Sequence, residues 1–385
     1  MFKRVFLIVM DGLGVGETID AEKYDSLNAN TLKHVLETRE YYLPTFEKLG
    51  LLSLVSKGNE PKAGYYGKIA PLNKAKDTLN GHYEMMGVIL DKPFKTYPDG
   101  FPILLISEIQ RVTGKEVIGN VAASGTEIIK ELGEMHMKTG AIIVYTSDDS
   151  VLQVAAHEDV VSVEELYDIC DKISKIVLTE EYGIGRVIAR PFVGEPGNFT
   201  RTEKRKDFAS IPPRNYMTLL YENGLDVIAL GKIKDIFADT NITTAIKTKN
   251  NIDGIVKLVD FSRTDFNGLL FLNLNDTDTL FGHRRDSEGY LKALEEIDAY
   301  LPAFINKLTD DDLVIFTGDH GNDPTYKGTD HTRENVPLVI YSKKFRYRGY
   351  LGLKDTYACI GATIVDNFGI KNDLEYGESF LDILK

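Results

Sequence analysis

The sequence predicts an α/β protein in which a mostly parallel sheet lies between layers of helices. Short apolar runs of strand length alternate along the chain with longer amphipathic runs of helical period. Several of the strand-like runs are apolar on both faces, as expected for a sheet that helices cover on both sides. The chain has 385 residues, more than one hydrophobic core usually spans, so we expect two domains.

Seven segments are expected to form strands, and they are spread along the whole chain. They are residues 5–10, 142–146, 187–188, 227–230, 269–274, 313–317 and 338–341. The segment 288–308 carries apolar residues at helical spacing, and we expect Pro302 to kink this helix. We read the apolar run 5–10 as the first strand and not as a signal sequence, because no cleavage site of small residues follows it.

The bulk composition argues against two classes of partner. The formal net charge is −13 and the sequence pI is near 5.1, so a large basic surface for nucleic acid is not expected. No stretch approaches the roughly 18 apolar residues of a membrane helix, so we expect no membrane partner either. Two cysteines, Cys170 and Cys359, do not suggest a disulfide framework and fit a reducing cytoplasm. An acidic protein that handles an anionic substrate must neutralise it locally, with a few Arg or Lys residues or with metal ions.

Short segments that contain aspartate follow four of the predicted strands. The strand 5–10 runs into "DG", 269–274 into "NDTD", 313–317 into "GDHG" and 142–146 into "SDDS". Ligands of open α/β sheets bind beyond the carboxyl ends of the strands. If the first three strands belong to one sheet, their acidic residues point into one crevice.

The span 278–331 contains three of the seven histidines of the chain, each a few residues from an aspartate. The three blocks are "DTLFGH" with Asp278 and His283, "GDHGND" with Asp319, His320 and Asp323, and "GTDHTRE" with Asp330 and His331. Any one of these pairs could be ordinary turn chemistry. Together, at the ends of strands, they favour a metal site, because imidazole and carboxylate bind zinc, manganese and related divalent ions.

With Asp11, the potential ligands are too many for one structural zinc ion, which four ligands complete. They divide naturally into two sets of three, as in the two-metal sites that catalyse in-line displacement at phosphorus. The hydroxyl of Thr78, in "AKDTLNGHYE", would then be a phosphoryl acceptor, since a hydroxyl is a poor nucleophile until a metal or a base activates it. The alternative is that Thr78 is simply the N-cap of the helix that follows.

At the level of whole blocks, the sequence resembles the bacterial phosphopentomutases, a family of the alkaline phosphatase superfamily. The similar blocks are "VMDGLG", "KDTLNGHYE", "ASGTEI", "GRVIARPFVGEPGNFTRT", "ALGKIKDIF", "NLNDTDTLFGHRRD", "DHGNDPTYKGTDHTRE" and "YGESFL". They extend from the first strand to the C-terminus. The metal blocks are shared across the superfamily, whereas "GRVIARPFVGEPGNFTRT" is much more specific to the mutases.

The resemblance implies a fold, ligands and a substrate site. It implies an alkaline-phosphatase-like core, residues 1–92 and 215–385, with an inserted α+β cap domain at 93–214. One metal would be held by Asp278, His283 and His331, and a second by Asp11, Asp319 and His320, with Thr78 carrying the phosphoryl group. Substrate contacts would be Ser147, Asp149, Val151, Arg186 and Arg201 from the cap and Lys232 from the core. Arginine forks suit a phosphate, and Ser147 and Asp149 suit sugar hydroxyls.

The implied activity is that of an isomerase of the intramolecular phosphotransferase class, acting on pentose phosphates in the cytoplasm as a monomer or small homo-oligomer. Manganese is the expected metal, and a sugar bisphosphate such as glucose 1,6-bisphosphate would prime the enzyme. Alternatives are a metal-dependent phosphatase or another phosphomutase of the superfamily, and a non-catalytic sugar-phosphate sensor. Ala75, Asn80 and Tyr83 stand where the family usually has glycine, threonine and tryptophan, and Asn275 and Thr277 are also unusual. No departure falls on Thr78 or on an implied ligand.

Overall fold

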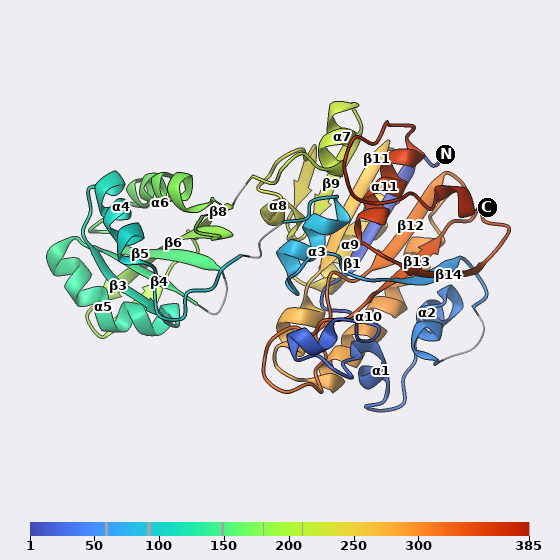
Figure 1. The fold of residues 1–385 in the computed structure, drawn as a ribbon, viewed down its shortest axis with the longest axis horizontal. Helices are drawn as coiled ribbons and strands as arrows, with labels where there is room; N and C mark the ends of the chain where they lie inside the picture. The colour runs from blue at the N-terminus through green and yellow to red at the C-terminus, as the bar shows by residue number, and fades with distance from the viewer. Residues whose placement is uncertain (58–60, 91–93, 148–149, 180, 210, 385) are drawn as a thin grey trace. The chain divides into compact units, whose positions relative to one another are not determined.

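The computed structural model describes residues 1–57, 61–90, 94–147, 150–179, 181–209 and 211–384. The chain forms two compact units, one made of Met1–Asp91 and Pro212–Lys385 and the other of Lys92–Ile211. We call the first the core unit and the second the insert unit. Figure 1 shows the helices and strands of each.

In the described residues, the core unit is built on an eight-stranded sheet with the order β10-β9-β11-β1-β12-β13-β2-β14. Its strands are β1 (Arg4–Met10), β2 (Tyr65–Ile69), β9 (Asp226–Leu230), β10 (Thr244–Ile246), β11 (Gly268–Leu274), β12 (Asp312–Thr317), β13 (Val336–Tyr341) and β14 (Gly349–Lys354). From β10 to β12 every neighbouring pair is parallel, and β13 runs antiparallel to both of its neighbours. The predicted α/β fold with a mostly parallel sheet is confirmed.

Both faces of this sheet are buried, as the uninterrupted apolar strands indicated. Along β1, Val5 and Leu7 pack into the hydrophobic core on one face, and Phe6 and Ile8 into the core on the other. The first face is covered by α3 (Thr78–Met85), α7 (Tyr216–Glu222), α8 (Ile233–Ile236) and α11 (Ala358–Asn367). The second is covered by α1 (Thr31–Leu36), α2 (Pro44–Leu49), α9 (Asn251–Phe261) and α10 (Ser287–Ile305), and Figure 1 shows α1, α2 and α10 on the side opposite α7 and α11.

The remaining regular turns of the core unit are short. Among the residues described for this unit, they are the 3₁₀ turns Ala21–Tyr24, Leu52–Val55 and Leu381–Ile383 and the π-helical turn Thr277–Gly282. The helix expected over 288–308 is α10, which ends at Ile305 with Pro302 inside its last turn.

The insert unit has a separate sheet and hydrophobic clusters of its own. Its strands are β3 (Val117–Ala122), β4 (Ile142–Thr146), β5 (Val151–His157), β6 (Arg186–Glu195), β7 (Asn198–Arg201) and β8 (Lys206–Ala209). They follow the order β3-β4-β5-β6-β7, and β8 pairs with β6. The helices are α4 (Ile103–Thr113), α5 (Gly125–Thr139) and α6 (Val163–Val177). One cluster joins the sheet to α4 and α6, and another joins it to α5, so the insert has an independent core.

All seven predicted strands are present, most with ends within two residues of the expected ones. The exception is 187–188, which is the start of the ten-residue β6. The strands β2, β3, β5, β7, β8, β10 and β14 were not predicted. Glycine and lysine interrupt the apolar pattern of β2 and β14. Cys170 and Cys359 are both buried and unpaired. In the part of the chain that is described, no helix has both the length and the apolarity needed to cross a bilayer.

Candidate metal centre

Three neighbouring parallel strands end at one edge of the core sheet, and each is followed by an aspartate. Strand β1 lies between β11 and β12, with Met10 opposite Leu274 and Val9 opposite Thr317. Asp11 follows β1 directly, Asp278 follows β11 and Asp319 follows β12, and all three are buried. The fourth predicted strand that acidic residues follow in the sequence is β4, and it belongs to the sheet of the insert unit.

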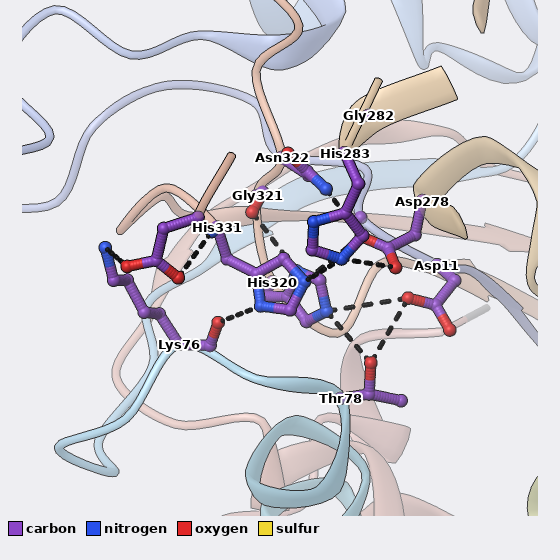
Figure 2. Close-up of polar contacts among 12 residues, drawn as sticks. Asp11, Lys76, Thr78, Asp278, Gly282, His283, His320, Gly321, Asn322 and His331 are labelled. Atoms are coloured by element: carbon purple, nitrogen blue, oxygen red, sulfur yellow. Dashed lines mark hydrogen bonds and ion pairs between the residues drawn. The ribbon is translucent and has the colours of Figure 1, made fainter. Parts of the chain in front are cut away.

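The first cluster consists of Asp278, His283 and His331, which Figure 2 shows side by side. Oδ2 of Asp278 lies 3.3 Å from Nε2 of His283, and Oδ1 of Asp278 lies 3.2 Å from Nε2 of His331. The two Nε2 atoms are 3.0 Å apart. Atoms of these three side chains therefore converge on one point, as the ligands of a metal ion would.

A π-helical turn brings Asp278 and His283 together. The backbone N–H of His283 donates to the carbonyl of Asp278 over 3.0 Å, a hydrogen bond that spans five residues. In an α-helix, residues five apart do not share a face, since neighbours on one face are three or four apart. Wider turns of this kind are often found at functional sites. The spacing in "DTLFGH" did not predict this turn.

The hydrogen bonds of both imidazoles leave their Nε2 atoms available to a ligand. Nδ1 of His283 lies 2.7 Å from the carbonyl of Thr329, and Nδ1 of His331 lies 2.7 Å from the carbonyl of Lys76. A carbonyl oxygen accepts only, so each Nδ1 carries a proton, and Nε2 presents a lone pair whenever the ring is neutral. Two lone pairs 3.0 Å apart repel each other unless a cation lies between them. This donor set fits a divalent metal ion.

Further contacts keep Asp278 ionised and oriented. The amide of the buried Asn322 donates to Asp278 over 2.7 Å, and Arg285 donates to the oxygen of the same amide over 2.7 Å. Burial alone would raise the pKa of Asp278, but its hydrogen bonds with His283 and His331 outweigh burial and lower this pKa well below its usual value. In turn, the hydrogen bond with Asp278 raises the pKa of His283.

A second cluster surrounds Nε2 of His320. This atom lies 3.5 Å from Asp11 Oδ1, 3.4 Å from Asp319 Oδ2 and 3.2 Å from the hydroxyl of Thr78. Nδ1 of His320 lies 3.1 Å from the carbonyl of Gly321, so Nε2 again faces the carboxylates. Ligand atoms of Asp11, His320 and Asp278 also lie within 4.8 Å of one another, which places the two clusters side by side with Asp278 between them.

The buried carboxylate of Asp319 provides a test of whether this second set fits a metal. Among the described residues, its Oδ2 atom is buried and makes no hydrogen bond of good geometry, although Nε2 of His320 and Nδ1 of His82 lie 3.4 and 3.3 Å away. A buried anionic oxygen without a well-formed hydrogen bond is costly, and a bound cation would satisfy it. In the chain without metal, burial alone would raise the pKa of Asp319, but the charge of His320 lowers this pKa to about 2. Burial alone would lower the pKa of His320, but the charge of Asp319 raises it to about 10.

Thr78 is the first residue of α3, and its hydroxyl points at the second cluster (Figure 2). The hydroxyl lies 3.5 Å from Asp11 Oδ1 in addition to its contact with His320. The interpretation of Thr78 as the N-cap is wrong: the cap is Asp77, whose carboxylate accepts from the backbone N–H of Asn80 over 3.0 Å. The Asn80 side chain also donates to Asp77, over 2.8 Å. Thr78 is therefore free of a capping role, and the N-terminus of a helix favours an anionic group on it.

Two buried charged residues that the sequence analysis did not select hold the loop before Thr78. Arg333 donates to the carbonyl of Ala75 over 2.7 Å and to that of Pro71 over 3.3 Å. Glu84 accepts from the backbone N–H groups of Leu72 and Tyr357, at 2.8 and 2.9 Å. Glu84 lies in the block "KDTLNGHYE" and Arg333 in "DHGNDPTYKGTDHTRE". Their closeness in sequence to Thr78 and to His331 was the signal that could have identified them.

Three further buried polar residues were also missed. Thr277 donates to the backbone carbonyl of Asp11 over 2.7 Å, which ties the π-helical turn to the end of β1. His82 contacts Asp319, and Asn273 contacts Asp11. Asn273 interrupts the otherwise apolar run "GLLFLNL" of β11, and such an interruption in a buried strand is itself a signal.

The residues expected to contact substrate fall in both units. In the insert unit, Ser147 follows β4, and Val151 pairs in register with Arg186 at the start of β5 and β6. Arg186 donates to Asp207 over 3.2 Å. Arg201 ends β7 and reaches the N-terminus of α5, where a Cβ on Gly125 would lie 1.8 Å from its Nη2 atom. Asp149 lies outside the described residues.

In the core unit, Lys232 lines a pocket of about 240 Å³ at the carboxyl ends of β9, β10 and β11. Lys247 and Lys249 also line this pocket, as do Asn273 and Asn275. Two aspartates, Asp235 and Asp276, line the pocket together with the three lysines, and Asn273 also contacts Asp11 of the second cluster.

An α/β core that gathers three histidines and three aspartates into adjoining clusters at its strand ends defines a metal-binding protein. Comparison with protein families agrees. The model of a family described as the metalloenzyme superfamily matches residues 3–372, and the chain belongs to this superfamily.

Comparison with solved structures shows similarity in fold. The PH0037 protein from Pyrococcus horikoshii superimposes with a TM-score of 0.51 at 13% identity, over 98% of this chain and 100% of that one. A phosphoglycerate mutase from Leishmania mexicana, crystallised at low cobalt concentration, gives a TM-score of 0.48 at 13% identity, over 98% of this chain and 97% of that one.

Proposed function

We propose that the protein is a phosphopentomutase that interconverts α-D-ribose 1-phosphate and D-ribose 5-phosphate, and the corresponding 2-deoxyribose phosphates. The observation that carries the proposal is the position of the Thr78 hydroxyl, 3.2 Å from Nε2 of His320 and 3.5 Å from Asp11 Oδ1. A hydroxyl in the middle of a metal-ligand cluster is placed for activation, and a mutase needs a residue that accepts and returns a phosphoryl group.

Two divalent ions, which we propose to be Mn²⁺, would be held by the two ligand sets. Asp278, His283 and His331 would form one set. Asp11, Asp319 and His320 would form the other, since both carboxylates lie within 3.5 Å of His320 Nε2. When bound, such ions neutralise the charge on the oxygens of a transferring phosphoryl group. Membership of the metalloenzyme superfamily and the orientation of all three Nε2 atoms support this part of the proposal.

The catalytic cycle we propose begins with phosphorylated Thr78, formed from a sugar bisphosphate such as glucose 1,6-bisphosphate. The bond between Thr78 Oγ1 and phosphorus breaks while the free hydroxyl oxygen of the pentose phosphate bonds to phosphorus. The proton lost by the sugar hydroxyl is balanced by the proton that Oγ1 gains. The resulting 1,5-bisphosphate presents its other phosphate to Thr78, and the reverse transfer regenerates phosphothreonine and releases the isomer.

The substrate must be held while it is phosphorylated at both ends. We assign this role to Ser147, Asp149, Val151, Arg186 and Arg201 of the insert unit and to Lys232 of the core unit, on the resemblance of their sequence blocks. Planar guanidinium forks bind phosphate oxygens in pairs, and an ammonium group adds a point charge. The insert would also exclude water, because transfer of the phosphoryl group to water would make the enzyme a phosphatase.

One experiment separates the mutase from its alternatives. The protein is incubated with ribose 5-phosphate, Mn²⁺ and a trace of glucose 1,6-bisphosphate, and the products are analysed. We expect ribose 1-phosphate as the product. Free phosphate as the main product would identify a phosphatase, and absence of turnover would favour a sugar-phosphate sensor.

A further inference from the structure

We infer that His82 and Asn273 are positioning residues, which fix the Thr78 backbone relative to the carboxylates of Asp11 and Asp319. The inference rests on the proposed function, in which Thr78 is the phosphorylated residue. Neither side chain touches the Thr78 hydroxyl, so both act through the groups that they hold.

His82 joins the nucleophile helix to a proposed metal ligand. Its Nδ1 atom lies 2.8 Å from the backbone carbonyl of Thr78 and 3.3 Å from Oδ2 of Asp319. Both are acceptors, so Nδ1 carries a proton that is directed at them. His82 is thus in contact with both the residue that would carry the phosphoryl group and the carboxylate that faces His320.

Asn273 completes the connection on the other nitrogen of the ring. Its amide nitrogen lies 2.9 Å from Asp11 Oδ2 and 3.2 Å from Nε2 of His82. A carboxylate accepts only, so the amide NH₂ group must face Asp11, and its second hydrogen then points at Nε2 of His82. This leaves Nε2 as the acceptor and agrees with a proton on Nδ1. The two residues form one continuous path from Asp11 to the backbone of Thr78.

Packing leaves this path little freedom to move. His82 is fully buried and Asn273 is 1% exposed. The imidazole stacks on Phe271, with the ring centres 5.7 Å apart and the planes 24° from parallel. Phe271 and Asn273 lie two residues apart on β11, so they share the face of the sheet on which α3 packs. Residues with locked rotamers can hold catalytic groups within fractions of an ångström.

The two contacts of His82 can be separated by two substitutions. Asparagine carries an amide N–H near the position of Nδ1, so His82→Asn keeps a donor for the Thr78 carbonyl and loses the acceptor for Asn273. Glutamine carries an amide oxygen near the position of Nε2, so His82→Gln keeps the acceptor and loses the donor. Asn273→Leu, which has the same branching pattern but no polar atoms, removes the hydrogen bond to Asp11. His136→Asn is the matched control, because His136 is also a buried histidine but belongs to the insert unit.

Three properties are measured: the rate of Thr78 phosphorylation by glucose 1,6-bisphosphate, followed by intact mass; the affinity for Mn²⁺ without substrate; and the melting temperature. At saturating Mn²⁺ we expect His82→Gln to phosphorylate at least about tenfold more slowly. Because the lost donor also faces Asp319, this variant should bind Mn²⁺ more weakly as well, whereas His82→Asn should stay close to the original protein. We expect Asn273→Leu to lose about tenfold in Mn²⁺ affinity. His136→Asn should change the melting temperature alone.

Equal phosphorylation rates in the two His82 variants, or an unchanged Mn²⁺ affinity in Asn273→Leu, would overturn the inference. If the original protein itself is not phosphorylated, the proposed function fails, and crystal structures of the metal-free variants decide the inference separately. In His82→Gln the distance from Thr78 Oγ1 to His320 Nε2 should then exceed the 3.2 Å of the original protein, and in His82→Asn it should not. An unchanged distance in His82→Gln would refute the positioning role.

Discussion

At the scale of single residues, the hydrogen bonds of three imidazole rings determine what the centre can bind. His283, His320 and His331 each direct Nδ1 at a backbone carbonyl. Each ring therefore turns Nε2 toward a carboxylate, and the orientation exists before any ion is bound. A proton and a metal ion compete for the same lone pair, so metal binding to these rings must depend on pH.

The pair of Asp319 and His320 determines the pH range over which the competition between the proton and the metal ion can be measured. Without metal, the charge of Asp319 overcomes the effect of burial and raises the pKa of His320 from 6.5 to about 10. A pKa that is higher in the folded state adds stability that is complete below the unfolded value and is lost as the pH rises through the folded value. We therefore expect the melting temperature of the metal-free protein to fall between about pH 6.5 and about pH 10.

With Mn²⁺ bound, His320 is already deprotonated, so the same rise in pH should not remove this contribution. Melting curves with a chelator and with excess Mn²⁺, recorded across that range, provide the measurement. In His320→Gln the difference between the two series should largely vanish. Identical pH dependence with and without Mn²⁺ in the original protein would contradict the account.

At the scale of elements, the site depends on the close approach of α3 to the end of β12. Gly81 makes this possible, because a Cβ at this position would lie 2.2 Å from the backbone carbonyl of Asp319. Thr78 sits one turn earlier on the same helix, so the contact at Gly81 sets how near its hydroxyl comes to His320.

We expect Gly81→Ala to destabilise the protein by about 1–3 kcal/mol, the usual cost of overpacking, and to lower the rate of Thr78 phosphorylation. Urea unfolding and intact-mass analysis measure the two effects. Gly349→Ala is the control, because an added methyl group there would meet no atom within 4 Å. If Gly81→Ala matches Gly349→Ala in stability and in phosphorylation rate, the proposed role of the contact between α3 and the end of β12 is wrong.

Much of this arrangement could be predicted from the sequence. Apolar runs located β1, β11 and β12, and a rule for parallel sheets placed Asp11, Asp278 and Asp319 at one edge. The π-helical turn of Asp278 could not be predicted, because local spacing favours helical neighbours three or four residues apart. The path through His82 and Asn273 was also out of reach, since it depends on how α3 packs on β11 and not on any local pattern.

At the scale of the whole molecule, the chain forms two units with separate hydrophobic cores. Both ligand clusters and Thr78 belong to the core unit, whereas Arg186 and Arg201 belong to the insert unit. An ion bound by the core unit stabilises the folded form of that unit directly, by the free energy of binding.

Calorimetry of the full chain should therefore show two unfolding transitions, of which Mn²⁺ raises one. At a Mn²⁺ concentration 100 times the Kd, the expected gain for the core unit is about 2.7 kcal/mol for each of the two proposed ions. Simultaneous substitution of Asp278 and His331 by alanine should remove the part of this shift that comes from the ion of the first ligand set, and it should leave the other transition in place. A single transition, or equal shifts of both, would show that the units do not unfold separately.

The central claim is that Thr78 passes its phosphoryl group to a pentose phosphate, and a single-turnover experiment tests it most directly. The protein is phosphorylated with radiolabelled glucose 1,6-bisphosphate, purified and mixed with unlabelled ribose 5-phosphate and Mn²⁺. Thr78→Ala, which keeps all six proposed metal ligands, should take up no label. In the original protein, the account predicts that label leaves the protein and is recovered in a pentose bisphosphate and then in pentose monophosphate. Label released as inorganic phosphate, or retained on the protein, would contradict it.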